Sequence, residues 1–217
     1  MTEIKICGIK DAGEITYLNE TNVSYAGFVL YPPSKRYIKI EDTGQLLDKL
    51  NQNIRKVAVT VSPDLKLIEA IEQAGFDIIQ IHGEIDIEIL KQCKIPVWLA
   101  VNLQKQEIWA EYMKYTNYEN VQAVLVDAKD FGSGKTFDWS SYTDQYMKTS
   151  YASFRKQLKQ TNKKFILAGG LTPDNVKEGI RIFSPDIVDV SSGVEGSNGK
   201  DFDKIIKFVE QVRGGEQ

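Results

Sequence analysis

The feature that most restricts the fold of this chain is the regular alternation of short β-type runs with helical patterns. We expect strands at residues 4–7, 26–30, 56–61, 78–82, 97–101, 123–127, 165–168 and 187–191. We expect helices at residues 11–21, 42–52, 64–74, 86–93, 105–116, 141–160, 173–182 and 201–212. Eight strands, each followed by a helix and uninterrupted by a linker, predict an α/β fold: a (β/α)₈ TIM barrel of parallel strands ringed by helices. A chain of this length is about the size of one such barrel, so we interpret residues 1–217 as a single domain.

Composition excludes several classes of function. The net charge is −3 with both signs interspersed, and no basic stripe lined by aromatic residues occurs, so nucleic acid is not an expected partner. The first strand begins within a few residues of the amino terminus, and no apolar run approaches the roughly 20 residues that span a bilayer. We therefore expect a soluble, cytoplasmic protein with no membrane partner. With His82 as the sole histidine, and with Cys7 and Cys93 far apart, no metal site or disulfide framework is expected.

Residues 165–176, FILAGGLTPDNV, combine an apolar strand, two glycines and a helix start. Gly169 and Gly170 would let backbone N–H groups approach a ligand closely, and a helix amino terminus favours an anion. A second corner, residues 189–193, ends the last strand in Ser191, Ser192 and Gly193. Two adjacent corners predict a two-sided phosphate site after strands seven and eight. Read alone, a Gly-Gly turn is equally consistent with plain chain reversal.

The first strand places two reactive side chains on one face. Side chains alternate along a barrel strand, so Ile4 and Ile6 would face the helices while Lys5 and Cys7 point inward. A strand cysteine is commonly just a small core residue. The Lys5 ammonium would instead favour the thiolate, which a cysteine acting as a base requires.

Three more polar residues fall at or near expected strand ends. Arg36, in a loop with two prolines, could clamp a carboxylate with its planar fork, or be an exposed cation on a rigid connection. His82 shares an inward face with Gln80 and could contact a ligand or simply be hydrogen-bonded. Asp127 closes an apolar strand, where partial desolvation would raise its pKa and suit a general acid; the alternative is a carboxylate that caps loop N–H groups.

Two remaining patterns carry less chemistry. The aromatic residues Trp109, Tyr112 and Tyr115 have nearly helical spacing, which favours core or subunit packing over a cofactor site. The glycine-rich residues 131–137 lack the spacing of a nucleotide-binding P-loop, and we interpret them as an active-site loop or a simple connection. Cys93 is interpreted as structural.

Taken together, these residues resemble the phosphoribosylanthranilate isomerase family of tryptophan biosynthesis. The matching segments, in family order, are KICGI at 5–9, SKRY at 34–37, QIHG at 80–83, VD at 126–127 with GSGKTFDW at 132–139, LAGGL at 167–171 and DVSSGVE at 189–195. The resemblance implies a cofactor-independent Amadori rearrangement of N-(5-phosphoribosyl)anthranilate to 1-(2-carboxyphenylamino)-1-deoxyribulose 5-phosphate.

The resemblance also implies roles for single residues. Asp127 matches the general acid that protonates the furanose ring oxygen, and Cys7 matches the general base that removes the C2 proton. Arg36 matches the contact to the anthranilate carboxylate, and Asp189 is placed to meet the anthranilate amino group. Lys5 and His82 lie at the mouth and are assigned to substrate binding. The phosphate is expected to bind at the two corners, and the candidate residues are Gly169, Gly170, Ser191, Ser192 and Gly193.

The sequence departs from the family pattern at several positions, and two other functions remain open. Lys35 stands where the family commonly has proline, so the Arg36 arm would be less rigid; Phe131 replaces a usual glycine, and residues 140–164 form a longer link than usual. A pentulose-phosphate epimerase is one alternative, although such enzymes commonly use a metal held by several histidines. A non-catalytic phosphosugar-binding barrel is another, although it would need neither Cys7 nor Asp127. The partner is a small phosphoribosyl substrate, and the chain is expected to be a monomer or a homodimer.

Overall fold

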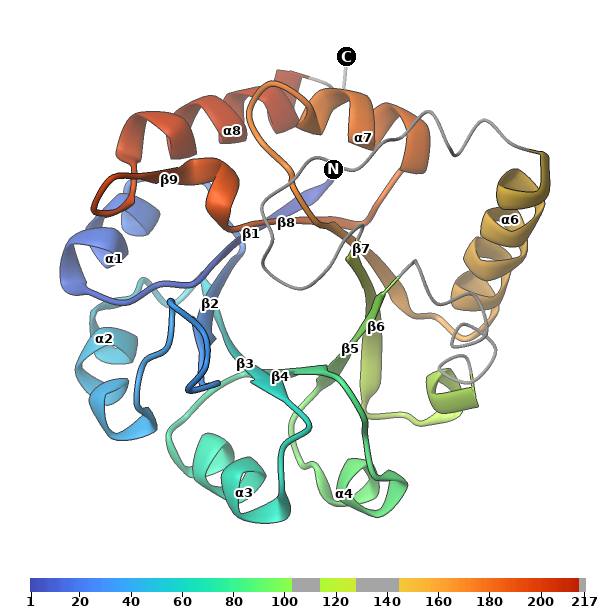
Figure 1. Ribbon diagram of the computed structural model, residues 1–217, viewed down its shortest axis with the longest axis horizontal. Coiled ribbons are helices and arrows are strands. Elements are labelled where there is room, and N and C mark those ends of the chain that lie inside the picture. The colour runs from blue at the N-terminus through green and yellow to red at the C-terminus, as the bar shows by residue number, and fades with distance from the viewer. Residues whose placement is uncertain (103–113, 128–144, 215–217) are drawn as a thin grey trace.

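The strands of the chain close into one parallel barrel, and the helices lie outside it (Figure 1). The structure, a computed structural model, describes residues 1–102, 114–127 and 145–214. The barrel strands are β1 Glu3–Cys7, β2 Tyr25–Val29, β3 Arg55–Val61, β4 Ile78–His82, β5 Val97–Asn102, β6 Val121–Asp127, β7 Lys164–Ala168 and β8 Ile187–Val190. The α-helices are α1 Ala12–Asn19, α2 Gly44–Lys49, α3 Leu65–Gln73, α4 Ile87–Gln92, α6 Gln145–Gln160, α7 Val176–Phe183 and α8 Phe202–Gly214. Closure comes from β1, which pairs in parallel with both β2 and β8.

The expected fold class is confirmed, and each expected strand lies within two residues of an observed one. The expected helix over residues 105–116 falls mostly outside the described residues, and its last part begins the short 3₁₀ turn η2, Lys114–Asn117. Another 3₁₀ turn, η1 Ile40–Asp42, precedes α2. Within the described part of the chain, no helix is long and apolar enough to cross a membrane.

Four of the described helices begin where an aspartate can cap them. The carboxylate of Asp11 accepts a hydrogen bond from the backbone N–H of Glu14, and Asp64, Asp86 and Asp201 do the same at the starts of α3, α4 and α8. Each cap satisfies a backbone donor that the first helical turn leaves unpaired and contributes about 1 kcal/mol. These caps fix where the chain turns from the strand ends back along the barrel.

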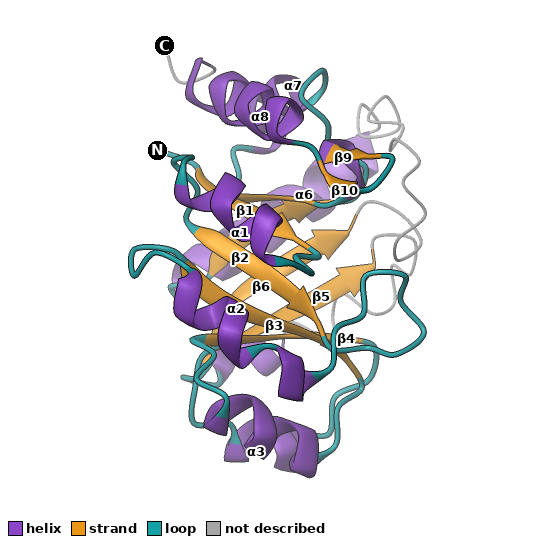
Figure 2. Cartoon of the chain, turned by 90° about the vertical axis from the view of Figure 1, so that its left-hand side faces the viewer, coloured by secondary structure: helices purple, strands orange, loops and turns teal. Residues whose placement is uncertain are grey.

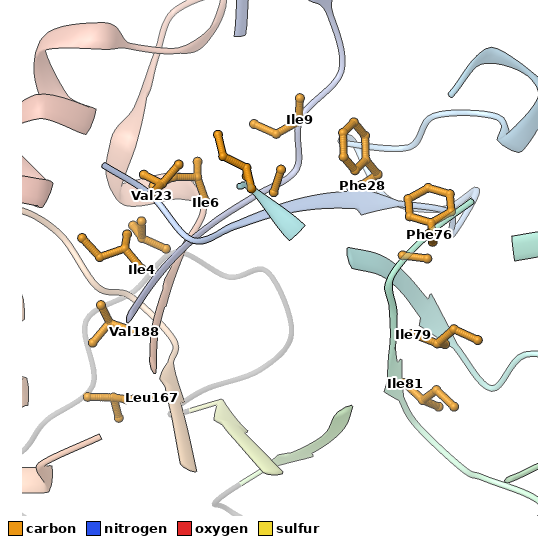
Figure 3. Close-up of a cluster of buried hydrophobic side chains, with 14 of the residues drawn as sticks. Ile4, Ile6, Ile9, Val23, Phe28, Phe76, Ile79, Ile81, Leu167 and Val188 are labelled. Carbon is orange, nitrogen blue, oxygen red and sulfur yellow. The ribbon is translucent and has the colours of Figure 1, made fainter. Parts of the chain in front are cut away.

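The core has two layers, as strand alternation predicts. Ile4 and Ile6 belong to the outer layer between the strands and the helices, part of which is shown in Figure 3. Cys7 belongs to the inner layer, with Tyr25 and Trp98 packed edge to face at a centroid distance of 4.9 Å. Full burial of each large apolar side chain contributes about 1.5–3 kcal/mol. The inward positions of β1 therefore combine ordinary core packing with chemically reactive groups.

A small hairpin after β8 was not predicted from the sequence. The 3₁₀ turn η4, Ser192–Val194, leads into β9, Glu195–Gly196, which pairs antiparallel with β10, Gly199–Lys200. Figure 2 shows the hairpin on the side toward which the strand arrows point. It therefore lies at the end of the barrel where βα loops carry function in this fold.

Candidate active site

The corner after β7 has the backbone that the glycine pair predicts. Gly169 and Gly170 have φ angles of +90° and +67°, a left-handed conformation that residues with a Cβ adopt rarely. The amide of Asn175 closes the turn: its Nδ2 donates to the carbonyl of Gly170 at 3.0 Å, and its Oδ1 accepts from the N–H of Thr172 at 2.8 Å. Asn175 is thus a structural residue of this corner that sequence reasoning did not single out.

The second corner packs directly on the first. A Cβ placed on Gly193 would lie 1.9 Å from the carbonyl oxygen of Leu171, a distance no real side chain tolerates. Glycine is therefore required if the chain after β8 is to touch the chain after β7. The structure brings the two predicted corners together, which is the arrangement that a two-sided phosphate site needs.

Lys5 forms a buried ion pair across the closing seam of the barrel. Its register partner in β8 is Asp189, and its ammonium lies 2.9 and 3.0 Å from the two carboxylate oxygens. Lys5 is fully buried and Asp189 is 8% exposed. Burial alone would lower the pKa of Lys5, but the charge and the hydrogen bonds of Asp189 favour the ammonium, and the pKa of Lys5 is raised. Lys5 is therefore a cation whose charge is largely matched by Asp189.

The thiol of Cys7 is buried next to this pair, and Lys5 favours its thiolate, as expected, although the net pKa of Cys7 is raised. Burial raises the pKa of Cys7, and the nearby Asp189 carboxylate raises it further, while Lys5 and Lys200 lower it by less. The reason is physical: Lys5 shares its charge with Asp189, so the desolvation of the thiolate dominates. The sulfur of Cys7 fits because Gly27 has no side chain: a Cβ at Gly27 would lie 2.9 Å from Sγ.

Arg36 reaches the strand end that carries Cys7. Its stem runs over Gly8, where a Cβ would lie 2.4 Å from Cδ of Arg36, and Gly8 has a φ of +87°. The guanidinium is paired with the carboxylate of Glu195: Nε donates to Oε1 at 2.5 Å, and Nη2 donates to Oε2 at 3.0 Å. The predicted placement of Arg36 by the mouth agrees with these contacts, while its partner Glu195 was not anticipated.

Glu195 is part of a network that also holds Lys200 and Ser191. The Lys200 ammonium, whose side chain is 1% exposed, lies 3.0 Å from Oε1 of Glu195 and 3.0 Å from the carbonyl oxygen of Ser191. The Ser191 hydroxyl donates to the carbonyl oxygen of Cys7 at 2.8 Å. Burial opposes the charge of Glu195, but Arg36 and Lys200 outweigh it and lower the pKa of Glu195 to about 2. The pKa of Lys200 is lowered, because burial outweighs the pull of Glu195.

His82 and Asp127 lie at the ends of β4 and β6. The amide nitrogen of Gln80 is 2.7 Å from Nε2 of His82, and the two side chains share the inward face, as expected. Burial, together with the charge of Lys5, lowers the pKa of His82 to about 3, so the ring is neutral. Asp127 is the last residue of β6 and partly exposed, in line with the inward positions Ala123 and Leu125. Its predicted pKa shift stays a prediction.

Some sequence-based expectations fall elsewhere. Phe131, Trp109 and Tyr112 lie outside the described residues, whereas Tyr115 is buried in the outer core. Cys93 is buried and its Sγ donates to the carbonyl of Ile89, with its pKa raised to about 11 by burial, which fits a structural role. Among the residues that the structure describes, no group of three acidic, histidine or cysteine side chains could hold a metal ion.

A closed (β/α)₈ barrel with a thiol, carboxylates and a guanidinium around the ends of its strands is the architecture of a barrel enzyme. The chain belongs to the N-(5'phosphoribosyl)anthranilate (PRA) isomerase family, whose sequence profile matches residues 4–211. It is 36% identical over 214 residues to the N-(5'-phosphoribosyl)anthranilate isomerase of Streptococcus mutans serotype c, covering 98% of this chain and 100% of that one.

Solved structures of the same family are also similar to this chain. A phosphoribosyl anthranilate isomerase in complex with reduced 1-(o-carboxyphenylamino)-1-deoxyribulose 5-phosphate matches with a TM-score of 0.80 and 30% identity, over 99% of this chain and 100% of that one. A structure of monomers generated from the dimeric Thermotoga maritima enzyme matches with a TM-score of 0.80 and 32% identity, over 99% and 100% of the two chains.

Proposed function

We propose that this chain is a phosphoribosylanthranilate isomerase of tryptophan biosynthesis that works by acid–base catalysis without a cofactor. The observation that carries the proposal is its similarity, over 99% of its length, to an isomerase bound to a reduced form of the product. The placement of Cys7 and Asp127 at the ends of β1 and β6 supports it, because the reaction needs a proton acceptor and a proton donor on one substrate.

In the first step Asp127 acts as general acid. Its carboxyl proton passes to the furanose ring oxygen as the bond from that oxygen to C1 breaks, and the nitrogen lone pair forms a protonated imine. Asp127 is left ionised. Partial exposure at the strand end supports this role, since such a group can reach the substrate and later exchange its proton with solvent.

In the second step Cys7 acts as general base. Its thiol first loses its proton to solvent, and the thiolate then takes the C2 proton. The electrons of the broken C–H bond form the C1–C2 double bond, and the imine cation is neutralised to an enolamine. The enolamine then tautomerises to the ketone, as the C2 hydroxyl loses a proton and C1 gains one. Burial makes the pKa of Cys7 high, so its thiolate is a strong base, and the adjacent imine cation favours that thiolate at the moment it is needed.

The remaining site residues hold the substrate. The phosphate lies against the paired corners at Gly169–Gly170 and residues 191–193, whose backbone N–H groups and hydroxyls suit an anion. Arg36 binds the anthranilate carboxylate, while Asp189 meets the anthranilate amino group with Lys5 behind it. His82 is neutral and contributes a hydrogen-bonding group. Remote contacts of this kind position the ribose between acid and base.

The test is the loss of anthranilate-type fluorescence when the purified protein meets freshly prepared phosphoribosylanthranilate. Rapid loss that persists after treatment with a metal chelator is the expected result. A chelator-sensitive reaction on a pentulose phosphate would favour the epimerase instead. A folded protein that binds the reduced product analogue but shows no turnover would favour a phosphosugar-binding barrel.

A further inference from the structure

The guanidinium of Arg36 is held by one edge. Its Nε and Nη2 both donate to the Glu195 carboxylate, at 2.5 and 3.0 Å, which is the side edge of the planar fork. Among the described residues, none accepts a hydrogen bond from Nη1. An arginine fixed in this way presents its terminal edge, Nη1 with the second N–H of Nη2, to a second carboxylate.

The carboxylate that holds Arg36 is itself held. Lys200, whose side chain is 1% exposed, contacts Glu195 at 3.0 Å and the two oxygens of Ser191 at 3.0 and 3.3 Å. Lys200 and Glu195 are register partners in the hairpin, and the backbone N–H of Lys200 donates to Oε1 of the buried Glu14 at 2.8 Å. The hairpin is therefore anchored to α1 and to the strand ends together, so Glu195 has little freedom to move.

Charge at this position is unbalanced. The cations are the buried Arg36 and Lys200 with the exposed Lys35 ammonium 3.4 Å from Glu195, and the carboxylates are Glu195 and the buried Glu14, which accepts from the backbone N–H of Lys200. The other charged pair that faces this cluster, Lys5 with Asp189, is neutral as a pair. An anion bound against the terminal edge of Arg36 would meet a surplus of positive charge.

We propose that Glu195 is a positioning residue for the isomerase reaction: it aims the terminal edge of Arg36 at the substrate carboxylate, and Lys200 fixes Glu195 for this purpose. The inference rests on the proposed function, because it names the anthranilate carboxylate as the group that Arg36 binds.

The test compares Glu195→Gln with the unaltered protein for binding of the reduced product analogue, which has a carboxylate, and of ribulose 5-phosphate, which has none. A charged hydrogen-bond pair of this kind is worth about 10- to 100-fold in affinity. We expect the analogue to bind 10- to 100-fold more weakly to the variant, with ribulose 5-phosphate unchanged within about threefold. In turnover, KM should rise while kcat stays nearly constant, since the carboxylate contact is equal in the ground and transition states.

Two controls separate positioning from simple charge or folding effects. In an Arg36→Met background, Glu195→Gln should cause no further loss, because Glu195 acts only through Arg36. Lys35→Ala, which removes an exposed contact to the same carboxylate, should change binding by less than about threefold. If Glu195→Gln does not fold, Glu195→Asp keeps the charge but shortens the arm, and it should weaken analogue binding in the same direction.

Tighter or unchanged binding of the analogue by a folded Glu195 variant would overturn the proposal, because removing a negative charge by itself favours an anion. Equal loss for ribulose 5-phosphate, or an undiminished loss in the Arg36→Met background, would also overturn it. These are binding measurements, so they decide the role of Glu195 even if the protein proves not to turn over phosphoribosylanthranilate.

Discussion

The ammonium of Lys5 contacts both carboxylate oxygens of Asp189, at 2.9 and 3.0 Å, although 184 positions separate the two residues in the sequence. Parallel pairing of β1 with β8 sets them side by side, so barrel closure itself creates the pair. Its consequence is electrostatic: Asp189 takes up much of the charge that Lys5 would otherwise offer to Cys7. The buried thiol next to the pair is protonated at neutral pH, with its pKa above the ordinary value.

Replacing Lys5 by Met should raise the pKa of Cys7 further. Lys5 is the largest lowering influence on that pKa, and burial and Asp189 raise it, so removal of the cation leaves only Lys200 to oppose them. The rate of alkylation by iodoacetamide against pH measures this, in a Cys93→Ser background that leaves one thiol. The variant's midpoint should lie at higher pH, and an unchanged or lower midpoint would refute the electrostatic account. Because an unpaired Asp189 costs about 3–5 kcal/mol, folding is checked on the same samples.

His82 should stay neutral throughout the physiological range. Its pKa is lowered to about 3 by burial and by the charge of Lys5. Because His82 is the sole histidine in the chain, its ring signals in NMR spectra can be assigned without ambiguity. We expect no titration between pH 8 and pH 5; a midpoint near the ordinary histidine value would contradict the burial found here.

The same residue should make stability depend on pH. A histidine with a lowered pKa in the folded state binds its proton only after the unfolded chain has done so. Its contribution is therefore complete above about pH 6.5 and is lost as the pH falls toward about 3. Urea unfolding of the unaltered protein and of His82→Asn between pH 7 and pH 4 should show a steeper decline in the former. Parallel pH profiles would count against this assignment.

Gly193→Ala should separate the two corners of the phosphate site. The new methyl group would meet the carbonyl oxygen of Leu171 at 1.9 Å, and a backbone atom cannot move aside cheaply. We expect weaker binding of inorganic phosphate by about tenfold or more, and a loss of stability of at least about 1–3 kcal/mol. Gly44→Ala is the matched control, because its Cβ meets nothing within 4 Å. Equal phosphate affinity in both variants would show that the corners do not form the site.

Glu195 should stabilise the fold at neutral pH and lose that effect in acid. Its pKa of about 2 lies below the ordinary value, so the contribution is present above about pH 4.5 and disappears as the pH falls toward about 2. At pH 7 the free energy of unfolding should exceed that of Glu195→Gln by about 2–3 kcal/mol. Chemical denaturation at several pH values measures the difference, which should shrink between pH 4.5 and pH 2. A difference that is constant across this range would refute the prediction.

The barrel itself could be predicted because its signal is local and repeated. The run at 78–82 matches β4 at both ends, and the alternation of Ile4 and Ile6 with Lys5 and Cys7 correctly assigned the two core layers. Such patterns depend only on the period of a strand and on which face is buried. The turn at Gly169 and Gly170 could also be predicted, because two successive residues in a left-handed conformation are rarely anything but glycine.

The electrostatic interactions between residues far apart in the chain could not be predicted from the sequence. Besides burial and neighbouring Lys5, the pKa of Cys7 depends on Asp189 at the other end of the chain. The partner of Arg36 comes from β9, a strand of two residues that is too short to show periodicity. The only local sign of that hairpin is Gly196-Ser197-Asn198-Gly199, a sequence of turn-forming residues that could have marked it.

The most direct test of the central claim is the turnover of phosphoribosylanthranilate by Cys7→Ser and Asp127→Asn, measured beside binding of the reduced product analogue. The account predicts that kcat falls about 10²- to 10⁴-fold in each variant while the Kd of the analogue changes less than about threefold. Cys93→Ser, which alters a buried structural thiol, should leave kcat unchanged. Turnover at the unaltered rate in either variant would contradict the assignment of Cys7 as base or Asp127 as acid.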